Sequence, residues 1–488
     1  MLNALLALLS AALLIFTFPG FNISWFAPIA LVPLLVAVAR ERRPWRRFLI
    51  GWAAGAVFWF GVCYWIQNDL ARFAGVGSLV AWLLMVLFAV TKGLHMAVFA
   101  LAAGILMRRW WAAPAVAAWW VAVESTHGSL GFAWLALGNA GIDMGVPLRL
   151  APITGVYGLS FVFSIMSATL ALALLRRPRP QLLWLLVLPF LTFLPPLPPA
   201  QRGQEAALLV QPNLAEDEEW TQESVLRTEE HLAELTTQSV LVQGSHPPSI
   251  VAWPEAPAPF YYDQDPRFRG LMNQLARTTR AYVLLGDVAR TVDGQPLNSA
   301  TLVSPAGQQV SRYDKVNLVP FGEFVPWPFN TFVNKISTEA GDFAAGSRVV
   351  VSPVDGHRIG TFICYESVFP GFVRKFAAGG AEALFNISND GWFGKTAARE
   401  QHLRIVRMRA AENRRWILRA TNDGITATID SAGRVRGVLP SFTEATSYTG
   451  FSYTSDQTFY TSHGDWFVWV CVAGVAVALL AERVRKRN

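Results

Sequence analysis

The division between long apolar runs and one extended polar stretch limits most strongly what this chain can fold into. Apolar runs long enough for membrane helices fill the first 200 residues, and one more lies near the C-terminus. Because 53% of the 488 residues are hydrophobic, the chain is too apolar for an ordinary soluble enzyme. We expect eight helical spans, at residues 2–18, 22–39, 49–67, 78–106, 112–126, 153–175, 182–199 and 464–482.

The basic residues between these spans predict how the chain crosses a membrane. Cytoplasmic loops carry an excess of Lys and Arg, and clusters follow the second, fourth, sixth and eighth spans. These clusters lie at residues 40–47, 108–109, 176–179 and 483–487. With eight spans, every cluster and both termini lie in the cytoplasm, and residues 201–460 face outward. In a bacterium with two membranes, the outward side of the inner membrane is the periplasm.

The first expected span has a second interpretation, because Met1–Leu14 could also be a signal peptide. This segment lacks a basic start, and a further span follows it directly. We therefore favour a helix that is retained in the mature protein.

The net charge of +7 comes from the expected membrane part. Residues 201–460 hold 24 of the 41 Lys and Arg and 28 of the 34 Asp and Glu, so the other residues hold 17 against 6. The basic excess therefore sets topology, and we expect no nucleic-acid partner. Lys92 and Glu124 lie within or near the spans, where they have either a function or a role in helix packing.

Residues 201–460 predict a separate layered domain between a seven-span N-terminal part (1–200) and a C-terminal span with a basic tail (461–488). Short β-rich runs alternate here with amphipathic segments, as in α/β or α+β domains with a buried sheet. The expected strands are Ala206–Gln211, Ser249–Trp253, Tyr282–Gly286, Ala300–Val303, Val349–Val351, Ile359–Cys364, Ala383–Ile387 and Trp416–Ala420. The expected helices are Glu216–Val240, Asp265–Arg280 and Lys395–Arg415.

Three of the strand-like runs end in residues that could do chemistry together. Cys364, in TFICYESVFP, is the one cysteine of three that lies outside an expected span, so it has no partner for a disulfide. A nucleophilic thiol needs a base and a nearby cation. Glu255 in WPE could take the proton, and Lys315 in YDK could stabilise an oxyanion. Taken singly, these residues could also be a buried core cysteine, a turn residue and a strand-end charge.

Together, the order Glu, Lys, Cys on the motifs WPE, YDK and CYE resembles the nitrilase superfamily. This resemblance implies an αββα sandwich that forms a thioester on its cysteine. With its membrane flanks, the chain is similar to the apolipoprotein N-acyltransferase family of Gram-negative inner membranes. The runs YDKVNLVPFGEFVP, NISNDGWFG and QPNL with Trp220 agree with it. The chain departs from the family at Gly391, where we expect alanine, and at Leu297, where tyrosine is common.

The resemblance implies a two-step acyl transfer. Cys364 attacks a phospholipid ester, typically that of phosphatidylethanolamine, and the thioester then acylates the free amine of a diacylglyceryl-cysteine apolipoprotein. Glu255 is the implied proton acceptor, Lys315 stabilises the tetrahedral intermediates, and the backbone N–H of Tyr365 assists. The resemblance requires no metal or cofactor, and the sequence shows no convincing His/Cys cluster for one.

Supporting and substrate-binding residues follow from the same resemblance. Glu323 and Glu366 are expected to support the triad, unless they are ordinary loop acids. The run Phe324–Val333 is either part of a core or an apolar lid that admits acyl chains. The substrate-binding candidates are Trp220, Asn298, Trp327, Phe329, Asn389 and Trp392. We expect contacts with membrane lipids and a monomer, because tethering and a lid would block the face through which soluble superfamily members associate.

Two other functions fit parts of the sequence. A membrane-tethered amidase of the nitrilase type would use the same triad with water as acceptor, but it needs neither eight spans nor an apolar lid. A transporter with a large outer domain would have paired charges along its spans and an internal repeat, whereas these spans carry few charges and no inverted repeat is evident.

Overall fold

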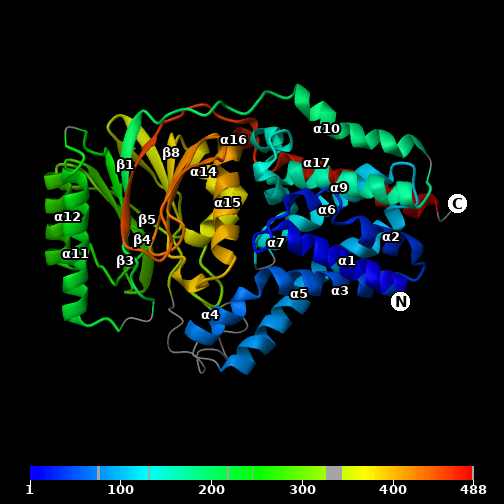
Figure 1. Ribbon diagram of the computed structural model, residues 1–488, viewed down its shortest axis with the longest axis horizontal. Coiled ribbons are helices and arrows are strands. Elements are labelled where there is room, and N and C mark those ends of the chain that lie inside the picture. Colours follow the sequence, from blue (N-terminus) through cyan, green and yellow to red (C-terminus); the bar gives the residue numbers. More distant parts are fainter. Residues whose placement is uncertain are drawn as a thin grey trace.

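The computed structural model describes the chain except residues 74–76, 130–131, 178, 217–218, 245, 326–342 and 486–488. Figure 1 shows a bundle of helices beside a layered domain of sheets and helices. Residues 194–204 lead from the bundle into the first strand of the layered domain, and the last helix returns to the bundle. The first helix begins, and the last helix ends, at the end of the bundle that points away from the layered domain.

The bundle is built from helices of very different lengths. Its helices are α1 (Leu2–Thr17), α2 (Val32–Arg40), α3 (Pro44–Cys63), α4 (Trp65–Phe73), α5 (Ser78–Leu106), α6 (Ala112–Glu124), α7 (Thr126–Ser129), α8 (Ala151–Thr154), α9 (Val156–Leu174), α10 (Val187–Phe190) and α17 (Trp466–Arg485). Short 3-10 helices join them at η1 (Ser24–Phe26), η2 (Leu137–Asp143), η3 (Pro147–Leu150), η4 (Arg179–Leu186) and η5 (Leu191–Phe193). Helices α3 and α5 pack closely because Gly55 and Gly93 face each other, and a Cβ on Gly55 would lie 2.8 Å from the Cα of Gly93.

Two described helices, α5 and α9, are long and apolar enough to cross a membrane. A third span results if α3 and the segment Trp65–Arg72, which meet at a bend of 57°, are counted together. Leu2–Thr17, Pro180–Phe193 and Trp466–Ala481 are apolar but shorter. The eight-span count therefore stays a prediction.

Two of the expected spans contain long stretches that are not α-helical. Within 22–39, a 3-10 turn and a set of turns precede the nine-residue helix α2, and within 182–199 short helical turns are followed by extended chain. Proline explains both interruptions, because Pro28, Pro189 and the LPPLPP run lack the N–H donor that a helix interior requires.

The layered domain contains two mixed six-stranded sheets. The first has the order β12-β1-β2-β3-β4-β5 and the second β11-β10-β9-β8-β7-β6. In the first sheet β1, β2 and β3 run parallel, and in the second β7, β8 and β9 do. The strands are β1 (Glu205–Gln211), β2 (Ile250–Ala252), β3 (Tyr282–Arg290), β4 (Pro296–Val303), β5 (Gln309–Asp314), β6 (Val351–Val354), β7 (His357–Ile363), β8 (Ala383–Ser388), β9 (Trp416–Thr421), β10 (Ala427–Ile429), β11 (Val435–Val438) and β12 (Ala445–Phe451).

Helices cover the outer face of each sheet, so the layers are helix, sheet, sheet, helix (Figure 1). Helices α11 (Gln222–Leu241) and α12 (Pro266–Thr279) cover the first sheet, and α14 (Pro370–Ala378) and α15 (Ala398–Asn413) lie between the second sheet and the bundle. A short helix, α16 (Phe459–His463), precedes α17. The expected αββα sandwich is confirmed.

Alternation along the strands builds two cores, one on each face of the first sheet. Along β1, Ala207 and Leu209 belong to the cluster between the sheets, whereas Leu208 and Val210 belong to the cluster under α11 and α12. The cluster between the sheets is continuous with the apolar core of the bundle. The layered domain therefore packs directly against the helices of the bundle.

Local capping sets the helix boundaries. Asp265 accepts hydrogen bonds from the backbone N–H groups of Arg267 and Phe268, so α12 begins close to the expected residue. The helix expected from Glu216 begins only at Gln222, because Thr221 and Ser224 form a capping box.

The strand expected at Val349–Val351 is instead Val351–Val354. Strands β10, β11 and β12 were not expected, and β5 was expected only as the strand-like run that ends at Lys315.

Candidate active site

The three residues of the expected triad each follow a strand. Glu255 comes three residues after β2, Lys315 directly after β5 and Cys364 directly after β7. Strands β2 and β5 run in the same direction in the first sheet, so their carboxyl ends share an edge, and β7 belongs to the second sheet. All three side chains are buried, with exposed fractions of 6%, 1% and 7%. The sandwich therefore brings them together between its two sheets.

Lys315 lies between two carboxylates. Its Nζ donates to Oε1 of Glu255 at 2.9 Å and to Oε1 of Glu323 at 2.9 Å. The Nδ2 of Asn298 donates to the same two oxygens at 2.7 Å each, and the carbonyl of Asn298 accepts from the backbone N–H of Lys315. The second oxygen of Glu323 accepts from the backbone N–H of Val319 at 2.8 Å, so the lysine loop holds its own carboxylate in place.

The charges around the thiol keep Lys315 protonated and disfavour a free thiolate. Burial opposes the charge of Lys315, but Glu255, Glu323 and Cys364 outweigh it and hold the pKa of Lys315 well above its usual value. Burial raises the pKa of the Cys364 thiol well above its usual value, Glu255 adds to this rise, and Lys315 offsets only part of it. The surroundings of Cys364 therefore favour the protonated thiol over the thiolate.

The backbone at the nucleophile has an uncommon conformation. Cys364 has a φ of +48°, a left-handed conformation that costs a non-glycine residue about 1 kcal/mol, and it begins the 3-10 helix η6 (Cys364–Val368). Glu366 stabilises this turn from behind, because its Oε2 accepts from the backbone N–H of Ile363 at 2.8 Å. Such a sharp turn after a strand projects the Cys364 side chain from the end of the sheet, as in strand-to-turn nucleophiles.

Glu366 also connects this turn to the lysine loop. Its Oε1 accepts from the hydroxyl of Tyr313 at 2.6 Å and from the backbone N–H groups of Val316 and Asn317 at 2.8 Å and 3.1 Å. Burial raises the pKa of Glu366 to about 7, against the effect of these donors. The structure thus places Glu366 behind the site, whereas Glu323 contacts Lys315 directly.

The remaining predicted site residues lie at different distances from the triad. The backbone N–H of Asn389 donates to Oε2 of Glu255 at 2.8 Å. Trp392 is 45% exposed in the short turn η7 (Gly391–Phe393). Trp220 packs against the cluster under α11 and α12, and Tyr365 is buried against bundle residues. Trp327 and Phe329 lie outside the described residues.

Glu216 is a carboxylate near the site that the sequence analysis did not single out. Its two oxygens accept from Nδ2 of Asn389 at 2.9 Å and Nδ2 of Asn422 at 2.8 Å. Burial raises the pKa of Glu216 to about 7, and nearby Asp423 and Glu255 add to this rise. A Cβ on Gly391 would lie 2.1 Å from Oε1 of Glu216, which gives a physical reason for glycine where we expected alanine. In the sequence Glu216 belongs to the acidic run AEDEE, which is typical of a solvated loop.

A second missed group lies behind Cys364. Nε2 of His402 is 3.1 Å from the carbonyl oxygen of Cys364, and Nδ1 is 3.1 Å from Oδ1 of Asp390. Arg419 donates to Asp390 at 2.6 Å, and all three side chains are fully buried. Burial alone would raise the pKa of Asp390, but Arg419 and His402 outweigh it and hold this pKa well below its usual value. Asp390 belongs to the motif NISNDGWFG, but no motif pointed to His402 in α15 or Arg419 in β9, because the three residues come from separate elements.

These features define a cysteine enzyme of the carbon-nitrogen hydrolase type. Among the described residues no group of His, Cys, Asp and Glu is arranged to hold a metal ion. The sequence profile of the carbon-nitrogen hydrolase family matches residues 209–454, and that of the apolipoprotein N-acyltransferase N-terminal domain matches residues 10–169. The two profiles thus cover the layered domain and most of the bundle.

Full-length relatives agree with both profiles. An apolipoprotein N-acyltransferase of Geobacter metallireducens is 34% identical over 98% of this chain and 95% of its own length. One of Pseudomonas putida is 30% identical over 99% and 97%. A solved amidase from Nesterenkonia sp. covers 54% of this chain and 94% of its own at 17% identity, with a TM-score of 0.40. The chain belongs to the apolipoprotein N-acyltransferase family and is an acyltransferase.

Proposed function

We propose that the enzyme moves a fatty acyl group from a phospholipid, through a thioester on Cys364, to the N-terminal amine of diacylglyceryl-cysteine apolipoproteins. The family of the chain supports this reaction. The observation that carries it is the convergence of Cys364, Glu255 and Lys315 between the two sheets, beside a bundle of apolar helices.

In the first half-reaction, Cys364 is the nucleophile and Glu255 the base. The Sγ–H proton passes to Glu255 while Sγ attacks the ester carbonyl carbon. The tetrahedral intermediate places its negative charge near the ammonium of Lys315 and the backbone N–H of Tyr365. When the intermediate collapses, the C–O bond breaks, the proton returns from Glu255 to the leaving alkoxide, and a lysophospholipid departs.

In the second half-reaction the acceptor amine replaces the alcohol. The amine attacks the thioester carbonyl, Glu255 removes a proton from the nitrogen, and the C–S bond breaks. The sulfur leaves with the proton that Glu255 returns to it, so the thiol is restored and an amide remains on the lipoprotein. Each step conserves protons between Glu255 and the reacting atoms.

The hydrogen bonds of Glu255 indicate which of its oxygens takes the proton. Its Oε1 already accepts from Lys315 and Asn298, whereas Oε2 accepts only from the backbone N–H of Asn389 among the described contacts. A carboxylate oxygen offers two lone pairs, so Oε2 has one left. Lys315 cannot serve as the base, because the two carboxylates beside it hold it in the charged form.

The membrane arrangement is part of the proposal. We infer eight spans in the bacterial inner membrane, with both termini in the cytoplasm and the domains divided at residues 1–200, 201–460 and 461–488. The arginine clusters support this topology, and so does the position of the outer ends of α1 and α17 at the end of the bundle away from the layered domain. The catalytic domain then lies in the periplasm.

The substrates and their contacts also belong to the proposal. Phosphatidylethanolamine is the inferred acyl donor, the enzyme acts as a monomer, and Asn298, Asn389 and Trp392 line the approach to Cys364. Trp220, Trp327 and Phe329 complete the set of inferred substrate contacts, the last two as part of an apolar lid.

A mass measurement tests the proposed function. Purified enzyme mixed with phosphatidylethanolamine should gain the mass of one acyl group on Cys364. A diacylated lipopeptide should then discharge this group and gain an amide-linked chain. Release of free fatty acid without acylated peptide would support a membrane-tethered amidase instead. No mass shift on Cys364 in the presence of active transfer would exclude the thioester route.

A further inference from the structure

A short segment of the bundle lies directly beneath the nucleophile's turn. We call residues 132–137 the floor loop. The ring of Phe132 is 6.0 Å from the ring of Tyr365, the residue that follows Cys364. The ring of Trp134 is 5.8 Å from that of His402, whose Nε2 contacts the carbonyl oxygen of Cys364. The floor loop therefore touches groups on two sides of the nucleophile.

The floor loop is also bound to the catalytic domain. Nε1 of Trp134 donates to Oε1 of Gln401 in α15 at 2.7 Å. The amide of Gln401 in turn donates to the backbone carbonyls of Pro19 and Val62 in the bundle at 3.2 Å and 3.1 Å. Trp134 is 5.9 Å from the ring of Phe393, which follows the exposed Trp392. Movement of this loop would thus be transmitted to the turn at Cys364 and to the edge of the site.

Two ionisable side chains of the bundle hold opposite ends of the floor loop. Nζ of Lys92, from α5, donates to the carbonyl oxygen of Phe132 at 2.9 Å and lies 4.9 Å from the ring centre of Trp59. Oε1 of Glu124, the last residue of α6, accepts from the backbone N–H of Leu137 at 2.7 Å. Lys92 is 5% exposed and Glu124 is 7% exposed.

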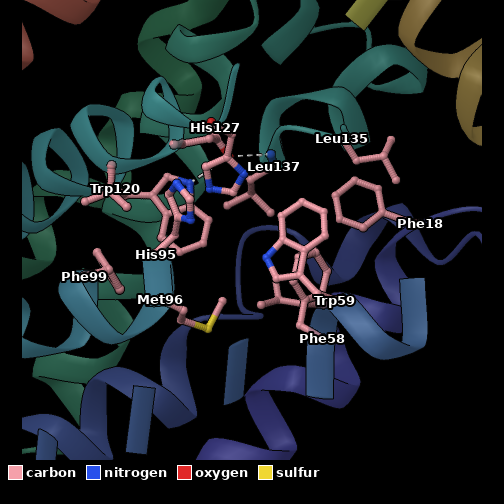
Figure 2. A pocket seen from close by; sticks show the side chains of 13 residues that line it. Phe18, Phe58, Trp59, His95, Met96, Phe99, Trp120, His127, Leu135 and Leu137 are labelled. Carbon is pink, nitrogen blue, oxygen red and sulfur yellow. Dashed lines mark hydrogen bonds between the residues drawn. The ribbon is translucent and has the colours of Figure 1, made fainter. Parts of the chain in front are cut away.

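The contact between Glu124 and Leu137 lies at a cavity in the bundle, and Lys92 contacts Trp59, another residue that lines this cavity. Figure 2 shows this cavity, with Leu135 and Leu137 of the floor loop on one side and Trp59 and Trp120 among the other lining side chains. Nε1 of Trp120 donates to the same Oε1 of Glu124 at 3.0 Å, so the carboxylate is held on the side of its own helix as well. The loop thus borders a cavity and is hydrogen-bonded to the helices at both of its ends.

Helix packing alone is a poor explanation for these residues. A buried charge in a membrane protein is expensive, and apolar side chains would pack the helices without that cost. Both side chains instead direct a hydrogen bond at the backbone of the same six-residue loop, one at its first residue and one at its last. Residues that bind backbone atoms specify the position of a loop whatever its side chains are.

We infer that Lys92 and Glu124 are positioning residues, which hold the floor loop against the turn of Cys364 so that the nucleophile and the groups around the oxyanion keep their geometry. This inference rests on the proposed acyl transfer. Neither side chain touches the reacting atoms, so both act through Phe132, Trp134 and their contacts. A displacement of about 1 Å in such a site costs up to about 100-fold in rate.

The test separates loss of the hydrogen bond from loss of charge. Glu124→Leu removes the acceptor for the N–H of Leu137, whereas Glu124→Gln keeps an amide oxygen that can accept it. We expect Glu124→Leu and Lys92→Met to lower kcat for transfer about 10- to 100-fold, with KM for both lipids unchanged. Glu124→Gln should retain at least about half of the wild-type kcat, because one oxygen still serves both donors.

A control variant accounts for damage to the bundle itself. Trp119 donates from Nε1 to the carbonyl of Phe99 at 3.1 Å, a bond of the same kind that does not involve the floor loop. Trp119→Phe should therefore leave kcat unchanged while it costs similar thermal stability. If Lys92→Met fails to accumulate in the membrane, Phe132→Leu tests the next contact on the same path, because it removes the ring next to Tyr365 and leaves the hydrogen bond of Lys92 and both charges in place.

The double variant Lys92→Met/Phe132→Leu completes the test. Both changes act in series on one path, from Lys92 through Phe132 to Tyr365, so the double variant should be no slower than the slower single variant. The inference would be overturned if the defects of the two single variants multiplied in the double variant. It would also be overturned by a wild-type kcat in Lys92→Met and Glu124→Leu, or by equal defects in Glu124→Gln and Glu124→Leu. Raised KM with unchanged kcat would overturn it too, since it indicates contact with substrate. Failure of the proposed function is distinct, because the wild-type enzyme itself would then show no transfer.

Discussion

Lys315 and Lys92 are both buried lysines, one in the catalytic domain and one in the bundle, but their surroundings differ in kind. Lys315 lies 2.9 Å from the carboxylates of Glu255 and Glu323. Lys92 donates to a backbone carbonyl and lies over an indole ring. Two carboxylates keep Lys315 charged, so it can stabilise charge that develops on the substrate. Lys92 contributes the position of a loop, so its replacement should have a smaller effect.

Substitution of Cys364 should have the largest effect on transfer, larger than substitution of either lysine. Cys364→Ala should reduce transfer by about 10⁴-fold or more, because no other group can carry the acyl chain. Cys364→Ser should trap little or no acyl-enzyme, since a carboxylate base deprotonates a hydroxyl far less readily than a thiol. Acylation of a lipopeptide measures the loss of transfer in Cys364→Ala. Mass spectrometry of the protein after mixing with phospholipid measures the acyl-enzyme in Cys364→Ser. Normal lipoprotein acylation by Cys364→Ala would contradict the mechanism.

The two lysines can be compared directly with the same substitution. Lys315→Met should lower kcat roughly 10²- to 10³-fold, because the oxyanion loses its cation and Glu255 and Glu323 face each other unpaired. Glu255→Gln, which keeps the size of the side chain but not its basicity, should be at least as slow. Steady-state transfer to a lipopeptide measures these rates. Equal defects in Lys315→Met and Lys92→Met would contradict the view that Lys315 stabilises charge on the substrate whereas Lys92 only positions a loop.

Glu216 extends the comparison to a carboxylate without a cationic partner among its described hydrogen bonds. Its pKa is about 7, against 4.5 for an ordinary glutamate, mainly because of burial. The folded state thus holds this proton to higher pH than the unfolded state, so stability from this group is full below about pH 4.5 and falls as the pH rises to about 7. Glu216→Gln should weaken the fall in melting temperature between pH 5 and pH 8. If Glu216→Gln leaves the pH dependence of the melting temperature unchanged, the carboxylate of Glu216 is solvated and its pKa is not raised.

Gly391 offers the smallest expected effect. Gly391→Ala should slow transfer only a few-fold, because the new Cβ must displace the flexible carboxylate of Glu216 rather than the backbone. Glu216→Ala in the same chain removes the clash and should restore most of the lost rate, as measured by lipopeptide acylation. Glu216→Ala alone is the matched control. An additive defect in the double variant would show that the two residues act separately.

Much of the site followed from short stretches of sequence. Glu255, Lys315 and Cys364 were predicted because each stands in a motif at the end of an apolar run, and parallel or aligned strands deliver such residues to one edge. Alternation between strands and helices predicted a layered domain with a buried sheet, and the resemblance to the nitrilase superfamily implied the αββα sandwich. The edge strands β11 and β12 were harder to predict because their two faces differ little in burial, as the half-exposed pattern of β11 shows, and β10 has only three residues.

The expected spans were less accurate than the expected strands. Composition identifies an apolar segment but does not say whether its backbone forms one helix, and prolines break the segments at 22–39 and 182–199 into turns. The length criterion leaves two spans, or three with the bent pair, among the described helices. Crossing of the remaining segments depends on how they pack, which hydropathy does not encode.

Local sequence alone predicted the division into an apolar bundle and a polar domain, and the triad of Glu255, Lys315 and Cys364, because hydropathy and motifs are properties of neighbours in the chain. Other features became visible only in the folded chain. These are the position of Glu366 behind the turn, the proximity of Glu216 to the site, and the contacts of Lys92 and Glu124 with the floor loop. Each depends on contacts between residues that lie from 13 to about 170 positions apart. Buried polar groups must find partners, and only the complete packing decides which partners those are.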